Sequence, residues 1–179
     1  MGTAFHYAEE VPEQQPETTA ITAGRDASGA LSPTIWTSTT WQSNGLDDTS
    51  NAATSVHTTG NYARYSNPSV RDFERAVAEL ECAEDALAFG SGMGAITSII
   101  LALCSTGDHI VAQSQLYGGT VAFLNGPCKR LGIDVTFVDG SKPGAFAAVV
   151  KPGKTMLVLA ESPSNPQMDV VDFSELASI

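Results

Sequence analysis

The sequence predicts an α/β fold, in which helices flank both faces of a mostly parallel sheet. Short continuous apolar segments, which are typical of buried strands, alternate along the chain with segments whose apolar residues have helical spacing. Turn-forming groups separate the two kinds of segment, such as Thr-Gly-Asp at 106–108 and Lys-Pro-Gly-Lys at 151–154. With 179 residues, the chain has the size of about one domain and can bury a core without disulfides or metals.

The first 60 residues are predicted to form an extended N-terminal arm. Residues 1–60 look irregular, because they are rich in Thr, Ser, Asn and Glu and show no clear apolar period. A structureless segment of this length is unusual inside a compact domain. It would be accounted for if the arm lay on another subunit.

The first predicted helix begins after Asn67, a favourable N-cap that is followed by Pro68 at the first helical position. Its apolar residues recur at helical spacing: Val70, Phe73, Val77 and Leu80. A second helix is predicted over residues 92–104, and two helical turns are expected on either side of Asn125-Gly126-Pro127, where a helix must break or kink. A short helix over 144–150 follows.

Asp172 is expected to start the last helix, with Glu175 as its capping-box partner. Four short apolar segments are predicted to be buried strands: residues 85–91, 109–113, 133–139 and 155–162. In parallel sheets ligands bind beyond the carboxyl ends of the strands. The glycine-rich stretch at 89–95 and the stretch "ESPSNP" both fall at the carboxyl ends of predicted strands, so both are candidates for a binding site.

Charge and hydropathy exclude several classes of function. The net charge of -11 argues against binding to nucleic acid or to an anionic membrane, since both need a basic face. The longest apolar run, Ile99–Cys104, is too short to span a bilayer, and the acidic N-terminus lacks the apolar core of a secretory signal. We therefore expect a cytoplasmic protein.

Cysteines and histidines are too scattered to predict a metal site. Cys82, Cys104 and Cys128 form no CxxC pair, and we interpret all three as reduced thiols that fill the core. The three histidines likewise have no second ligand at suitable spacing, so no metal is assigned.

Three glycines precede the predicted helix at 92–104, and they favour either a phosphate site or a tight turn. Backbone N–H groups at a helix N-terminus attract anions, and the glycines Gly90, Gly92 and Gly94 would let an anion come close. The common nucleotide motifs are disfavoured. The pattern is not GxGxxG, and Ala95 stands where a phosphate-binding loop needs lysine. The glycines alone leave both readings open.

Four motifs resemble the Cys/Met-metabolism family of pyridoxal phosphate (PLP) enzymes, which includes cystathionine γ-synthase, cystathionine γ-lyase, methionine γ-lyase and O-acylhomoserine sulfhydrylase. They are "YARYSNP", "SGMGA", "QLYGGT" and "ESPSNP", and they occur in the family order. The resemblance runs from about Thr19 to the end of the chain. It implies PLP as cofactor and an incomplete PLP-dependent transferase (fold type I) large domain, whose first part is residues 61–179.

The resemblance implies a role in cofactor binding for eight residues: Tyr62, Arg64, Ser91, Gly92, Met93, Tyr117, Glu161 and Asn165. The residues of "SGMGA" would hold the cofactor phosphate, and those of "YARYSNP" would reach a neighbouring subunit's phosphate. Tyr117 would stack on the pyridine ring as the catalytic aromatic residue, and Asn165 would bond the ring's phenolic oxygen. Taken singly, each residue also has an ordinary structural interpretation, as a half-buried aromatic, a surface ion pair or a turn.

The resemblance implies γ-elimination or γ-replacement on cystathionine or O-acylhomoserine, by a homotetramer built from dimers with shared sites. Methionine γ-lyase, O-acylhomoserine sulfhydrylase and a non-catalytic phosphate-binding module remain alternatives. Gly119 disfavours methionine γ-lyase, which typically carries cysteine there.

The family's Schiff-base lysine and its ring-nitrogen aspartate lie beyond Ile179, and the four lysines present are in polar turns or at a helix end. We therefore expect the 179-residue chain alone to be inactive.

Overall fold

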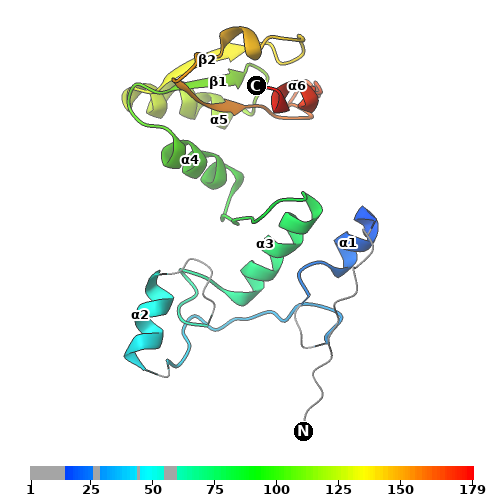
Figure 1. Ribbon diagram of the computed structural model, residues 1–179, viewed down its shortest axis with the longest axis vertical. Coiled ribbons are helices and arrows are strands. Elements are labelled where there is room, and N and C mark those ends of the chain that lie inside the picture. Colours follow the sequence, from blue (N-terminus) through cyan, green and yellow to red (C-terminus); the bar gives the residue numbers. More distant parts are fainter. Residues whose placement is uncertain (1–14, 26–28, 44, 55–59) are drawn as a thin grey trace. The chain divides into compact units, whose positions relative to one another are not determined.

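The computed structural model describes residues 15–25, 29–43, 45–54 and 60–179. It consists of two compact units, Met1–Ala88 and Phe89–Ile179, and Figure 1 shows the elements of each. None of the helices among the described residues has the length and the apolar content needed to cross a bilayer.

The N-terminal unit contains more helix than the sequence predicts. The prediction that residues 1–60 are irregular is wrong in two places, since α1 (Pro16–Thr22) and α2 (Leu46–Thr54) are helices. Proline at the start of α1 suits the first helical position. Two aspartates in the first turn of α2 interact favourably with the helix dipole. Residues that favour the first turn of a helix therefore start helices here even though the apolar period of these segments is weak.

The third helix, α3 (Pro68–Leu80), begins as predicted. The Asn67 side chain accepts a hydrogen bond from Ser69 N–H at 2.9 Å. Ser69 Oγ accepts from Trp36 N–H at 2.8 Å and donates to the carbonyl of Thr34 at 2.9 Å. This part of the N-terminal arm is therefore bonded to the chain's own helix.

The buried side of α3 is charged rather than apolar. Asp72, Glu74 and Ala78 are buried, whereas Val70 and Phe73 of the apolar series are exposed. The carboxylates are paired, Glu74 with Arg71 at 3.1 Å and Asp72 with a neighbouring arginine at 3.6 Å. Buried charges are tolerated only when paired in this way.

The helix ends on a residue in the left-handed conformation, Cys82, with φ of 51°. Ala83 N–H donates to the carbonyl of Ala78 at 2.8 Å, as in a Schellman motif. The residue at this position faces solvent, so the interpretation of all three cysteines as core residues is wrong for Cys82. Cys104 and Cys128 are buried as expected, and burial raises the pKa of both thiols.

Residues 85–91 do not form the predicted strand. Their polar backbone groups bond instead to side chains of α3. Glu74 accepts from Ala88 N–H at 2.8 Å, and Arg71 donates to the carbonyl of Ala86 at 3.4 Å and forms an ion pair with Asp85 at 2.6 Å. A strand needs a neighbouring strand to pair with, and side chains satisfy this segment instead.

The second unit is built on a parallel sheet of three strands, in the order β2-β1-β3. The strands are β1 (His109–Gln113), β2 (Asp134–Val138) and β3 (Thr155–Leu159), and both pairs are parallel. Three of the four predicted strands are therefore confirmed, and so is the α/β class.

Helices cover both faces of this sheet, as Figure 1 shows. Ile110 and Ala112 of β1 join one core cluster with residues of α4 (Gly92–Leu103) and of the helix that begins with α5 (Gly118–Phe123). Val111 points to the other face, where the short 3₁₀ helix η2 (Ala147–Val149) and α6 (Phe173–Ala177) lie. The period of two along a strand separates the two cores.

The helix after β1 neither breaks nor starts again at Pro127. It continues from α5 through a π-helical segment, η1 (Leu124–Cys128), that contains this proline. Proline removes one helical N–H, and a wider π turn is a known way to absorb that loss. In place of the predicted break, the helix is widened locally at Pro127 and continues.

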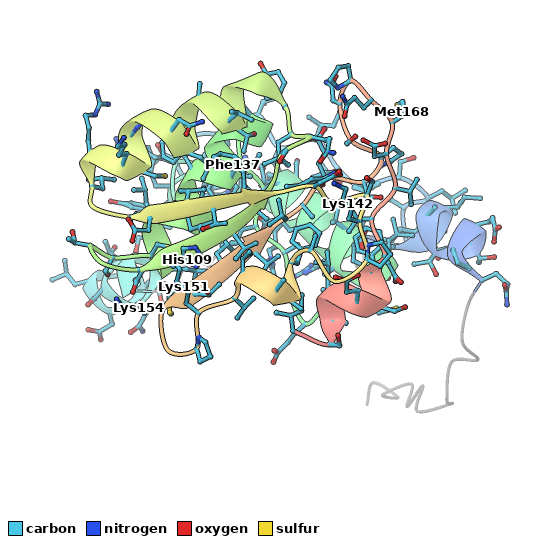
Figure 2. The ribbon with its side chains drawn as sticks, turned by 90° about the horizontal axis from the view of Figure 1, so that it is seen from above. His109, Phe137, Lys142, Lys151, Lys154 and Met168 are labelled. Atoms are coloured by element: carbon cyan, nitrogen blue, oxygen red, sulfur yellow. The ribbon has the colours of Figure 1, made fainter. Side chains whose placement is uncertain are left out.

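At the amino end of the sheet, His109 is fully buried between two threonines. Its Nδ1 lies 2.8 Å from Thr155 Oγ1, and its Nε2 lies 2.8 Å from Thr136 Oγ1. Burial and, to a lesser degree, the charge of Lys151 lower the pKa of His109. Figure 2 shows His109 at the same end of the sheet as Lys151 and Lys154, while Lys142 lies at the opposite end.

Candidate cofactor site

The N-terminus of α4 forms an open turn, residues 91–94, which is the predicted anion-binding turn. Ser91 is the N-cap, and its hydroxyl accepts from Gly94 N–H at 3.0 Å. The hydrogen bonds of the described residues include none that is donated by the N–H group of Gly92 or of Met93. A Cβ added to Gly90 or Gly92 would meet nothing within 4 Å, so the turn faces open space. Two free donors at the positive end of a 12-residue helix fit a phosphate group.

The start of α5 lies next to the start of α4. Thr120 is buried, and its hydroxyl lies 3.7 Å from the Sδ atom of Met93. Tyr117 is the N-cap of α5, and the residue is 52% exposed. Its ring lies over Gly119, since a Cβ at Gly119 would come within 2.5 Å of the Tyr117 Cε1 atom. An aromatic face is thus available beside the anion-binding turn.

Glu161, just after β3, holds the backbone of Tyr117. Its carboxylate oxygen Oε2 accepts from Tyr117 N–H at 2.9 Å. Its own N–H donates to Gln113 Oε1 at 3.0 Å. Sequence reasoning missed Gln113, whose only signal was a polar residue at the end of a short, mostly apolar strand.

Asn165 lies on a loop that is closed by its own hydrogen bonds. Ser164 is fully buried, donates its N–H to the carbonyl of Asp169 at 2.9 Å, and accepts from Asp169 N–H at 3.0 Å. Met168 in this loop has a positive φ of 60°. Asn165 itself is exposed, which leaves its amide accessible at the carboxyl side of β3.

Tyr62 and Arg64 belong to the N-terminal unit. The Arg64 guanidinium lies 4.8 Å from the centre of the Tyr62 ring and 5.8 Å from that of Tyr65. An isolated antiparallel bridge to Thr40 fixes the backbone of Tyr62. This cluster keeps the cationic group at an aromatic surface, and its action on a cofactor phosphate stays a prediction.

None of the four lysines lies in an apolar pocket, because all of them are exposed. Lys142 forms a 3.4 Å ion pair with Asp139, just after β2. Asp139 also accepts from Ser141 Oγ at 2.7 Å and from Gln115 Nε2 at 2.8 Å. These bonds, chiefly that of Ser141, hold the pKa of Asp139 well below its usual range, and they tie the end of β2 to the segment before Tyr117.

Three parts of the predicted site therefore gather within the second unit: the anion-binding turn, Tyr117 and Glu161, with Asn165 four residues further along the chain. The donors suit a phosphate, the exposed ring suits a flat heteroaromatic group, and the exposed amide suits an oxygen on that group. The described residues fit PLP by this chemistry. They contain no cluster of three or more side chains that could hold a metal ion.

Comparisons with known proteins agree with this chemistry. A family model described as "Cys/Met metabolism PLP-dependent enzyme" matches residues 17–179. The O-succinylhomoserine sulfhydrylase of Pseudomonas aeruginosa is 44% identical over 118 residues, which cover 66% of this chain and 29% of that protein. The L-methionine gamma-lyase of Treponema denticola is 42% identical over the same shares of the two chains.

The crystal structure of MetB from Corynebacterium glutamicum is similar in fold, with a TM-score of 0.78 and 31% sequence identity. The similarity covers 92% of this chain and 42% of that structure. The chain thus spans less than a third of the two curated relatives and less than half of the solved structure.

Proposed function

We propose, since this chain belongs to the Cys/Met metabolism family of PLP-dependent enzymes, that the whole protein acts at the γ-carbon of an amino-acid substrate of sulfur metabolism. The reaction is γ-elimination or γ-replacement on cystathionine or an O-acylhomoserine. The observation that carries the proposal is the meeting of the α4 N-terminus, Tyr117 and Glu161 beyond the carboxyl ends of the strands.

In the proposed site, the N–H groups of Gly92 and Met93 and the hydroxyl of Ser91 hold the cofactor phosphate. Tyr117 presents its ring to the pyridine ring, and Asn165 donates a hydrogen bond to the phenolic oxygen. The cofactor, when bound, supplies an electron sink for bond breaking at the substrate's α- and γ-carbons. In this proposal the Tyr117 hydroxyl gives a proton to the departing sulfur or oxygen atom.

Gly119 disfavours methionine cleavage relative to reactions of cystathionine or an O-acylhomoserine. The Tyr117 ring already occupies the position that a side chain at 119 would need. A cysteine that organises methionine next to this tyrosine therefore has no room without movement of the ring. The similarities to an O-succinylhomoserine sulfhydrylase and to an L-methionine gamma-lyase are nearly equal, so this choice rests on Gly119.

Product assays on the protein in its whole natural length test this proposal. The assays compare kcat/KM for four reactions. These are turnover of O-succinylhomoserine with cysteine, turnover of O-succinylhomoserine with sulfide, cleavage of cystathionine and cleavage of methionine. We expect one of the first three to be fastest. A higher kcat/KM for methionine would overturn the assignment, and the absence of bound PLP would favour a non-catalytic phosphate-binding module.

We further propose that residues 61–179 are the first part of the PLP-binding large domain, in a cytoplasmic homotetramer with sites shared between subunits. Arg64→Ala should weaken cofactor retention. Mixing Arg64→Ala subunits with subunits that lack the lysine bonded to the cofactor should restore part of the activity. Failure of the mixture to regain activity would contradict shared sites. The 179-residue chain alone should retain no pyridoxyl-lysine after borohydride reduction.

A further inference from the structure

Gln113 is buried at the carboxyl end of β1, where its amide joins all three strand ends. The residue is 0% exposed, and its Oε1 atom accepts from Glu161 N–H beyond β3 at 3.0 Å. This bond fixes the orientation of the amide, because only the oxygen can accept from an N–H group. The Nε2 atom is then left buried without a hydrogen-bond partner among the described residues.

Gly140, beyond β2, packs directly against the same amide. A Cβ at Gly140 would come within 2.7 Å of the Cγ and Cδ atoms of Gln113. Real side chains essentially never make contacts that short, so the backbone at Gly140 encloses the amide on this side. The side chain therefore has little freedom to turn away from Glu161.

A glutamine is a costly choice if its purpose is only to fill this space. An apolar side chain of similar volume, such as methionine, would leave no buried amide donor without a partner. What glutamine supplies and methionine does not is the acceptor for Glu161 N–H. Glu161 in turn accepts from Tyr117 N–H at 2.9 Å.

We propose that Gln113 is a positioning residue, which acts through Glu161 to set the Tyr117 ring for the flat cofactor. This inference rests on the proposed function. Two hydrogen bonds link these residues. The Gln113 amide oxygen accepts from Glu161 N–H, and the Glu161 carboxylate accepts from Tyr117 N–H. Loss of the first bond frees the carboxylate that holds the second.

A double-mutant cycle with Gln113→Met and Glu161→Ala tests the proposal in the whole-length protein. The readouts are the Kd for PLP and the circular dichroism induced in the absorption band of bound PLP, with the melting temperature as a check on folding. We expect Gln113→Met to raise the Kd about 2- to 13-fold, the effect of one lost hydrogen bond, and to change the induced signal. In the Glu161→Ala background the same substitution should have no further effect on the Kd.

Thr155→Val is the matched control, because it removes a hydrogen bond to His109 at the opposite end of the sheet. It should lower the melting temperature without changing the Kd for PLP or the induced signal. Gly140→Ala is the second probe, since its Cβ pushes on the amide without removing it. It should raise the Kd in the same direction as Gln113→Met.

The outcomes separate this inference from the proposed function. A wild-type protein that binds no PLP overturns both. Two outcomes overturn the inference alone, provided that the wild-type protein binds PLP. One is an unchanged Kd for PLP in Gln113→Met, and the other is additive effects of Gln113→Met and Glu161→Ala on that Kd. Should Gln113→Met fail to fold, Gly140→Ala decides, and an unchanged Kd in that variant contradicts the role of Gln113.

Discussion

Adding a single methyl group at Gly119 should displace the Tyr117 ring and weaken PLP binding. In Gly119→Ala the new Cβ would lie 2.5 Å from Tyr117 Cε1, whereas ordinary van der Waals contact begins at 3.4 Å. The ring must therefore move by about 0.9 Å at this atom. A side chain held about 30° from its preferred rotamer costs about 0.5–1.5 kcal/mol. If binding needs the ring in its present position, the Kd should rise about 2- to 13-fold.

Gly118→Ala is the matched control, because a Cβ at Gly118 meets nothing within 4 Å. Both glycines lie in the first turn of α5, so both substitutions gain a similar helix propensity, at most about 1 kcal/mol. Titration of the whole-length protein with PLP, followed by absorbance, should give a wild-type Kd for Gly118→Ala and a raised Kd for Gly119→Ala. Equal Kd values for the two variants would refute the reasoning.

Gly119→Cys adds a thiol to the same Cβ and tests the choice of substrate. Loss of one polar contact in the transition state costs about 1–3 kcal/mol, or roughly 5- to 150-fold in rate. A cysteine that makes such a contact should therefore raise kcat/KM for methionine, provided that the Tyr117 ring moves to admit it. Unchanged methionine turnover would remove Gly119 as the cause of the preference.

Substitutions at three further residues have expected outcomes. Ser91→Ala removes the acceptor for Gly94 N–H and should lower the free energy of unfolding in urea by about 0.5–2 kcal/mol, whereas Ser91→Thr should keep most of it. Asp172→Ala removes the cap of α6 and should cost about 1 kcal/mol in the same assay; a loss equal to that of Asp172→Asn would contradict a capping role. The folded state lowers the pKa of His109, so its contribution to stability is present above the unfolded pKa of 6.5 and is lost as the pH falls below it. Unfolding at pH 7.5 and 5.5 should show this loss, and His109→Gln should show less of it.

Local chemistry made much of the fold predictable. Asn67 with Pro68 begins α3, and Asp172 begins α6, because each cap satisfies N–H groups within its own first turn. The capping box of α6 is only half formed, since Glu175 accepts from Gly144 N–H at 2.8 Å instead. Short apolar segments became strands where another such segment could pair with them. The start of α4 was also predictable, since Ser91 caps a helix at the predicted position, and its binding of an anion stays a prediction.

The sequence by itself determined the α/β class, the helix caps, the three paired strands and, through four motifs, the family and its cofactor. Tertiary structure alone decided which groups share an environment. Residues 85–91 are not a strand, because a strand exists only with a hydrogen-bonded neighbour and side chains of α3 took that place. In the sequence, Gln113 is a polar residue at the end of a short, mostly apolar segment. It meets Glu161 and Gly140 only because the carboxyl ends of the parallel strands lie side by side, a proximity that no local pattern encodes.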